Sequence, residues 1–241
     1  MKTSWPQVVI AVAAGYAVCF QLGKVPAALP LIGAEFGLSL WQRGVIVSSL
    51  SVLTAVSGIF IGLWANRYQA ERTAVLALAI AVGAGVAGSY ATDFMALLVT
   101  RLVEGLGYIL AMAALPAVVS ANAAPDDRPL ALAFWGSTVP GGMAVLMLSS
   151  PLLMESAGLG WRGLWIVTAA AIGAIAILFF VSVRPQPAGK RVTAPPLADL
   201  KHAVRFSTVA LVGLFILYSV QFLAVISFLP TLLVEQSDLA L

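Results

Sequence analysis

Seven stretches of about 20 mostly apolar residues constrain this chain most, because a helix of that length crosses roughly 30 Å of hydrocarbon. They are predicted at 7–32, 44–65, 73–90, 94–120, 130–153, 163–183 and 207–230. Of the 241 residues, 61% are hydrophobic and 10% charged, whereas soluble proteins carry roughly a quarter charged residues. The sequence therefore predicts an all-α protein embedded in a lipid bilayer and argues against a soluble enzyme.

The composition argues against a metal site, thiol chemistry or a catalytic nucleophile. Cys19 and His202 are the one cysteine and the one histidine of the sequence, too few for a disulfide framework, a structural zinc site or a Cys/His pair. HExxH and GxSxG motifs are absent from the sequence. Its basic residues form no stripe, so the net charge of +3 does not indicate nucleic-acid binding. We expect no metal, no cofactor and no enzymatic activity.

The distribution of Lys and Arg predicts the orientation, because these residues accumulate in short cytoplasmic loops. With the N-terminus inside, the outer loops hold only Arg43 and Arg162. The inner side holds Lys2, Arg67, Arg72, Arg128, Arg184, Lys190, Arg191, Lys201 and Arg205. We predict a multi-pass protein of a bacterial-type inner membrane with a cytoplasmic N-terminus.

A stretch rich in proline and basic residues separates the seventh span from the other six. We predict a six-helix transmembrane domain over 1–183, a cytoplasmic basic linker over 184–206, and a seventh helix opening a second domain over 207–241. This order is that of the first half of a twelve-helix protein, so we expect a truncated chain whose partner is the missing C-terminal six-helix half. The sequence Ala-Ala-Leu-Pro occurs at 27–30 and again at 113–116, in agreement with two inverted three-helix units.

Three motifs are similar to those of the major facilitator superfamily of secondary transporters. Residues 62–72, GLWANRYQAER, resemble its Gly-x-Leu-Ala-Asp-Arg-x-Gly-Arg-Arg/Lys loop, and 101–107, RLVEGLG, resemble its Arg-x-x-Gln-Gly-x-Gly. Gly160-Trp161-Arg162 is another frequent feature of the family. The resemblance implies the amino-terminal six-helix domain plus helix seven of a carrier that works by alternating access on a small solute. Residues 132–143 look like the cyanate and nitroimidazole transporter branch.

Two conformational elements are predicted, the first of them from the resemblance. Gly62, Asn66, Arg67 and Arg72 match the family's latch, which holds one face of the carrier shut. Asn66 stands where the family usually has an acid, so we expect a weaker latch here. The sequence Pro140-Gly141-Gly142 is a candidate flex point of the fifth span, although close helix packing is the more ordinary use of such glycines.

Lys24, Arg101 and Glu104 lie inside predicted spans, where a central charge costs at least about 2.5 kcal/mol. Gln21 shares a helical face with Lys24, and Tyr108 shares one with Arg101 and Glu104. Our hypothesis is that Arg101 pairs with a proton-exchanging Glu104, which leaves Lys24 as an uncompensated cation for an anionic substrate. The alternatives are that Lys24 reaches the outer surface and that Arg101 and Glu104 form a static structural pair.

Tyr218 and Gln221 of the seventh span are further candidates for substrate binding, or else packing residues. Glu35 is expected to face the outer solvent. The leading functional hypothesis is proton-coupled secondary transport of a small anionic solute. The alternatives are a multidrug/proton efflux transporter and a non-transporting truncated fragment.

Overall fold

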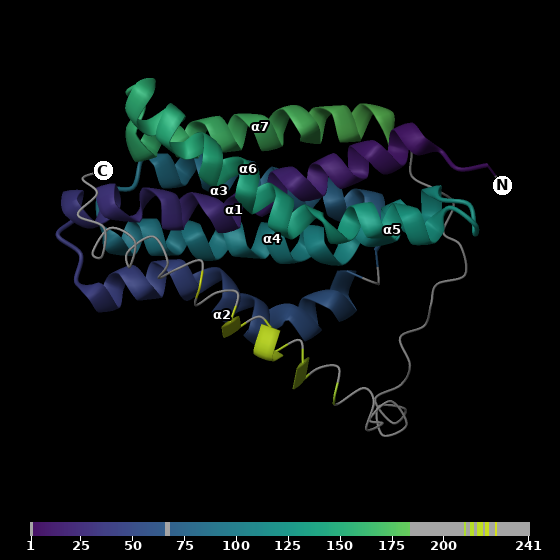
Figure 1. Ribbon diagram of the computed structural model, residues 1–241, viewed down its shortest axis with the longest axis horizontal. Helices are drawn as coiled ribbons and strands as arrows, with labels where there is room; N and C mark the ends of the chain where they lie inside the picture. The colour runs from purple at the N-terminus through teal and green to yellow at the C-terminus, as the bar shows by residue number, and fades with distance from the viewer. Residues whose placement is uncertain are drawn as a thin grey trace. The chain divides into compact units, whose positions relative to one another are not determined.

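The computed structural model describes residues 2–65 and 68–183, together with residues 210, 213, 214, 216–218, 220, 221 and 225. The chain divides into two compact units, Met1–Val192 and Thr193–Leu241. The first unit is a bundle of helices that run along its long axis (Figure 1). The described part of the chain is helical, with no strand, which confirms the predicted all-α class.

The helices of the first unit follow the six predicted spans. They are α1 (Trp5–Glu35), α2 (Leu40–Ala65), α3 (Ala70–Ser89), α4 (Phe94–Asn122), α5 (Arg128–Gly136), α6 (Thr138–Pro151), the π-helical turn η1 (Leu152–Ser156) and α7 (Gly160–Ser182). Within the described residues, five stretches are long and apolar enough to cross a membrane: Trp5–Glu35, Ala70–Ser89, Phe94–Asn122, Arg128–Ser156 and Gly160–Ser182.

Local sequence explains where several helices begin and end. Pro6 lies in the first turn of α1, where a missing N–H loses no hydrogen bond. That helix ends just before Gly37, whose φ of +60° suits glycine better than residues with a Cβ. At the start of α4 the Asp93 side chain accepts a hydrogen bond of 2.9 Å from the backbone N–H of Ala96.

The fifth span is broken at Ser137, between α5 and α6. Pro140 has no N–H to donate to the carbonyl of Gly136, and its ring crowds that carbonyl, so a continuous α-helix is disfavoured at this point. The predicted flex point, Pro140 to Gly142, therefore lies in the first turns of α6, directly after the break.

Glycines allow α6 to approach α1 next to this break. A Cβ on Gly142 would lie 2.6 Å from the carbonyl oxygen of Tyr16, and a Cβ on Gly141 would collide with the Tyr16 ring. The hydroxyl groups of Tyr16 and Ser137 are hydrogen-bonded at 2.8 Å. The break is thus held against α1 by close packing and by one polar contact.

The principal contacts between helices stay the same when the first three spans are exchanged with the next three. Helix α1 packs on α4, α6 and α7, while α4 packs on α1, α2 and α3, and α3 packs on α7. Exchanging α1 with α4, α2 with α6 and α3 with α7 reproduces the same set of contacts. This is the two-unit arrangement that the repeated Ala-Ala-Leu-Pro sequence indicates.

Buried apolar residues form two separate cores along the bundle. The first core includes Val8, Ala11, Ala14, Ala17 and Val18 of α1, and Leu110, Ala111, Ala114, Leu115, Val118 and Val119 of α4. The second core includes Val25, Ala28 and Ile32 of α1 and Leu97 of α4. Gln21 and Lys24 of α1 and Arg101 and Glu104 of α4 lie between these two cores.

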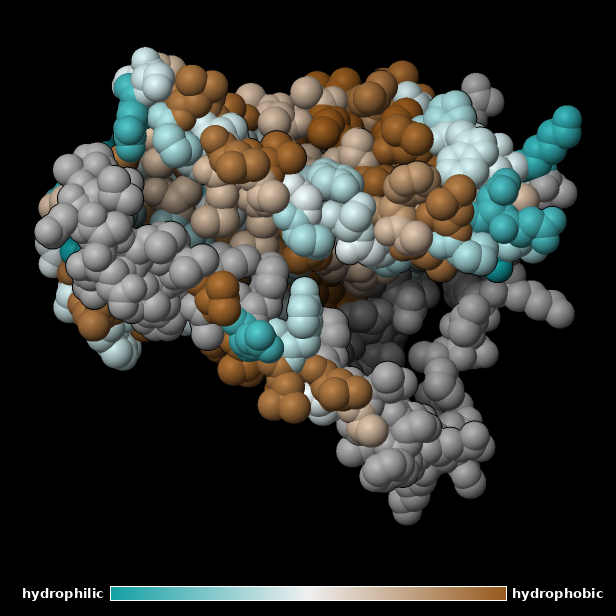
Figure 2. Space-filling view, in the orientation of Figure 1, coloured by the Kyte–Doolittle hydropathy of each residue, from teal (hydrophilic) through white to brown (hydrophobic). Residues whose placement is uncertain are grey.

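The surface has the polarity that a lipid environment requires. Apolar side chains cover the face of α7, and polar side chains gather at the two ends of the bundle (Figure 2). On α7 the exposed large apolar residues are Ile166, Ile177, Leu178, Phe180 and Val181. The long axis of the bundle is therefore the direction in which the helices would cross a bilayer.

Candidate functional site

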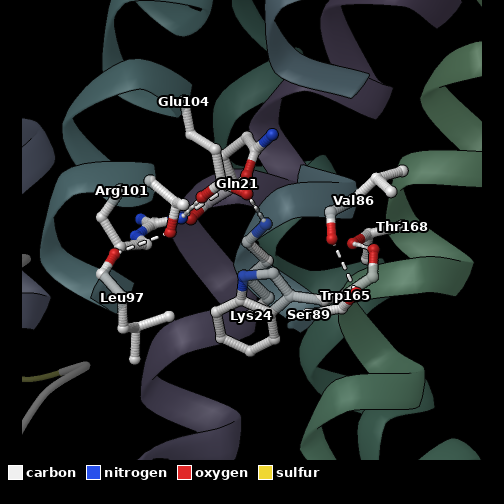
Figure 3. A network of polar contacts seen from close by, with 10 residues as sticks. Gln21, Lys24, Val86, Ser89, Leu97, Arg101, Glu104, Trp165 and Thr168 are labelled. Carbon is white, nitrogen blue, oxygen red and sulfur yellow. Dashed lines mark hydrogen bonds and ion pairs between the residues drawn. The ribbon is translucent and has the colours of Figure 1, made fainter. Parts of the chain in front are cut away.

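Four polar side chains from α1 and α4 meet between the two cores (Figure 3). Gln21 and Lys24 come from α1, and Arg101 and Glu104 come from α4. All four are at most 1% exposed. Because the Lys24 side chain is completely buried, the alternative that it reaches the outer surface is wrong.

Glu104 binds both cations at once. The Lys24 ammonium donates to Oε1 of Glu104, and Nη1 of Arg101 donates to Oε2 at 2.5 Å. The expected contact between Arg101 and Glu104 is present, but the prediction that Lys24 has no counter-ion is wrong. Because α1 packs directly on α4, the second carboxylate oxygen lies within reach of the ammonium.

Gln21 fixes the guanidinium of Arg101 to α1. Nη2 of Arg101 donates to the Gln21 carbonyl oxygen at 3.0 Å, and Nη1 lies 3.4 Å from Gln21 Oε1. With two cations and one carboxylate, the cluster carries one positive charge in excess. We call Gln21, Lys24, Arg101 and Glu104 the buried charge cluster.

Trp165 of α7 completes the surroundings of Lys24. The Lys24 ammonium lies 4.6 Å from the centre of the Trp165 ring, and this ring is also fully buried. Trp165 was not among the site residues predicted from the sequence. The sequence gives one indication of its importance, since Trp165 follows Trp161 of the Gly-Trp-Arg motif by four residues. That spacing does not show which helix the ring contacts.

Three buried donors around Lys24 have no hydrogen-bond partner within the described residues. They are Nε2 of Gln21, Nε of Arg101 and Nε1 of Trp165. Buried donors in proteins are nearly always paired. A group rich in acceptors, such as a carboxylate, would satisfy donors of this kind.

A second ionic cluster ties α1 to α7 at the predicted outer end. Glu35 accepts from Nη1 of Arg162 at 2.5 Å and from Nε1 of Trp161 at 2.6 Å. Nη2 of Arg162 also donates to the Ala91 carbonyl at 2.9 Å. Glu35 was expected to face solvent, and its side chain is 41% exposed. Its contacts with Trp161 and Arg162 were not predicted.

The remaining predicted site residues do not join the buried charge cluster in the described part of the chain. Tyr108 is half-buried and packs against the first core. Arg72 is exposed in the first turn of α3. Tyr218 and Gln221 belong to the second unit, so their part in substrate binding stays a prediction.

The predicted latch also stays a prediction. Asn66 and Arg67 lie outside the described residues. Gly62 is in α2, but its surroundings are likewise outside the described part.

Membrane-length helices around a buried ion cluster are common in multi-pass transport proteins. The sequence profile described as Major Facilitator Superfamily matches residues 9–241. The chain therefore belongs to this family of membrane transporters.

Two relatives are transporters of named solutes. The chain is 31% identical over 212 residues to the 3-(3-hydroxy-phenyl)propionate transporter of Escherichia coli (strain K12), covering 85% of this chain and 51% of that protein. It is 27% identical over 188 residues to the hexuronate transporter of Bacillus subtilis (strain 168), covering 77% and 44%. The chain thus spans about half the length of these relatives.

A solved structure shows the same fold. A bacterial homolog of the human lysosomal transporter Spinster, inward-facing and occupied, superposes with a TM-score of 0.78 at 18% identity. The match covers 97% of this chain and 54% of that one.

Proposed function

We propose that this chain carries out secondary active transport of a small organic anion by alternating access, coupled to protons through Glu104. The observation that carries the proposal is the buried charge cluster, in which two cations share one carboxylate. Buried charges are costly in a membrane protein and ordinarily mark a substrate, ion or proton pathway.

The charge balance of the cluster favours coupling of a proton to an anion. While Glu104 is ionised, it occupies both Lys24 and Arg101. When it takes up a proton, both cations lose their counter-ion, and the carboxylate of a solute can replace it. A proton and a monovalent anion that bind together leave the total charge unchanged, so we infer one proton for each carboxylate.

The unpartnered donors support an anionic solute. Nε2 of Gln21 and Nε of Arg101 lie in the same buried cluster without an acceptor among the described residues. A carboxylate offers several acceptor positions to amide and guanidinium donors, and charge-assisted hydrogen bonds of this kind are the strong ones. The two relatives described above are named for carboxylate solutes, which supports the same class.

The test is uptake into proteoliposomes that contain the purified chain. We expect an inward proton gradient to stimulate uptake of labelled 3-(3-hydroxyphenyl)propionate or hexuronate. Lys24→Met should abolish high-affinity uptake, and Glu104→Gln should make the remaining uptake indifferent to the gradient. Lys2→Met, which removes an exposed lysine at the start of the chain, is the matched control and should behave as wild type.

Two results would contradict this proposal. Uptake that ignores both the gradient and Glu104→Gln would remove the proton coupling. An unchanged affinity in Lys24→Met would remove the anion site. If neither carboxylate is taken up but overexpression protects cells against a panel of hydrophobic drugs, the efflux alternative holds.

A further inference from the structure

Trp165 faces the Lys24 ammonium from a third helix. The buried charge cluster comes from α1 and α4, whereas Trp165 comes from α7 (Figure 3). The ammonium therefore has a carboxylate on one helix and an aromatic face on another. An aromatic face attracts a cation through its quadrupole, most strongly where water is excluded.

The Trp165 ring is held by shape and ring contacts. Trp161 packs edge-to-face against it, with ring centres 5.4 Å apart and an interplanar angle of 87°. On α3, a Cβ at Gly88 would come within 2.9 Å of Cδ1 and Nε1 of the indole, so glycine leaves the space that the ring needs. Nε1 itself has no hydrogen-bond partner in the described part of the chain.

We propose that Trp165 is a positioning residue of the transport site, acting through Lys24. Its ring holds the ammonium in place both when Glu104 binds it and when a protonated Glu104 releases it. Because the ring carries no charge, it does not compete with a solute carboxylate for Lys24. This inference rests on the proposed function, since it assigns Trp165 a task within the same site.

A first experiment tests the contact without any solute. Thermal unfolding of the purified chain in detergent is compared for wild type, Trp165→Leu, Lys24→Met and the double variant. If the ring acts on the ammonium, Trp165→Leu lowers the midpoint less in the Lys24→Met background than in wild type. Equal effects in the two backgrounds would overturn the proposal. The four proteins form a double-mutant cycle. If Trp165→Leu does not fold, Trp165→Phe, which keeps an aromatic face, takes its place in this cycle.

Phe179→Leu is the matched control for this cycle. Phe179 is also a fully buried aromatic residue of α7, but it belongs to the first core and not to the surroundings of Lys24. Its effect should add to that of Lys24→Met without coupling. Coupling as strong as that of Trp165 would mean that the cycle reports general packing, which would overturn the proposal.

A second experiment measures binding of 3-(3-hydroxyphenyl)propionate to the same proteins. Trp165→Leu should weaken binding roughly tenfold, and Trp165→Phe should weaken it by less, because cation–π contacts are strongest with Trp. In the Lys24→Met background neither change should weaken binding further, and a further loss there would contradict a role through Lys24. If wild type binds no carboxylate, the proposed function fails, while the unfolding cycle still decides whether Trp165 holds Lys24.

Discussion

Glu104 is the carboxylate that neutralises charge in the buried charge cluster. It is completely buried and joins Lys24 and Arg101, so both cations rely on the same carboxylate. Removing one partner of a buried ion pair costs about 3–5 kcal/mol, because the charge that stays behind has lost water and counter-ion together. The stability of the bundle and the proposed proton coupling therefore depend on the same side chain.

The first prediction follows from this shared carboxylate. Glu104→Gln leaves two adjacent buried cations and should lower the free energy of unfolding by about 3 kcal/mol or more. Adding Lys24→Met brings the cluster back to one positive charge and should recover part of the loss. Thermal unfolding in detergent measures both variants. A double variant no more stable than Glu104→Gln would show that repulsion between the two cations is not the cause.

At the scale of helices, close packing of backbone on backbone joins α3 to α4 at Gly107. A Cβ there would lie 2.8 Å from the carbonyl oxygen of Ala77 and 2.9 Å from the backbone nitrogen of Ala81. Both are backbone atoms, which cannot move aside as the end of a side chain can. This contact positions α4, and with it Arg101 and Glu104.

The second prediction concerns this packing. Gly107→Ala should destabilise the bundle by about 1–3 kcal/mol, because the added methyl group forces the helices apart. Gly83→Ala on α3 is the control, since a Cβ at Gly83 meets nothing within 4 Å. Alanine there should be neutral or stabilising by up to about 1 kcal/mol. Equal midpoints for the two variants in thermal unfolding would contradict the close approach.

The third prediction concerns the break between α5 and α6. Pro140→Ala restores an N–H that can bond to the Gly136 carbonyl, so the two helices should join and the midpoint of unfolding should rise. If the break bends during transport, the initial rate of uptake should fall in the same variant. Pro129→Ala is the control, because Pro129 lies in the first turn of α5, where a new N–H gains no helical hydrogen bond. A faster rate with Pro140→Ala would rule out a flex point.

For the whole molecule, sequence patterns predicted the helices and the family but not the contacts between helices. The length of each apolar run set the six spans of the first unit, and three motifs indicated the superfamily. Helical spacing also placed Gln21 beside Lys24 and Arg101 beside Glu104. It could not show that Lys24 meets Glu104, since that contact depends on how α1 packs on α4. Trp165 was missed for the same reason, as its partner lies on another helix.

The fourth prediction tests the orientation of the whole bundle. Cys19 is the one cysteine of the sequence and is buried, so a Cys19→Ser background suits labelling of introduced thiols. Ala157 and Asp126 are exposed in loops predicted to lie on opposite sides of the membrane. A membrane-impermeant maleimide added to intact cells should label Ala157→Cys and leave Asp126→Cys unlabelled until the membrane is opened. The reverse pattern would place the N-terminus outside.

The position of the buried charge cluster has a consequence for the two structural repeats. Gln21 and Lys24 belong to the first triplet of spans, and Arg101 and Glu104 belong to the second. The ion pair between Lys24 and Glu104 and the hydrogen bonds between Arg101 and Gln21 therefore join one triplet to the other. A solute or a proton that rearranges these contacts would therefore change the surroundings of both repeats in the same event.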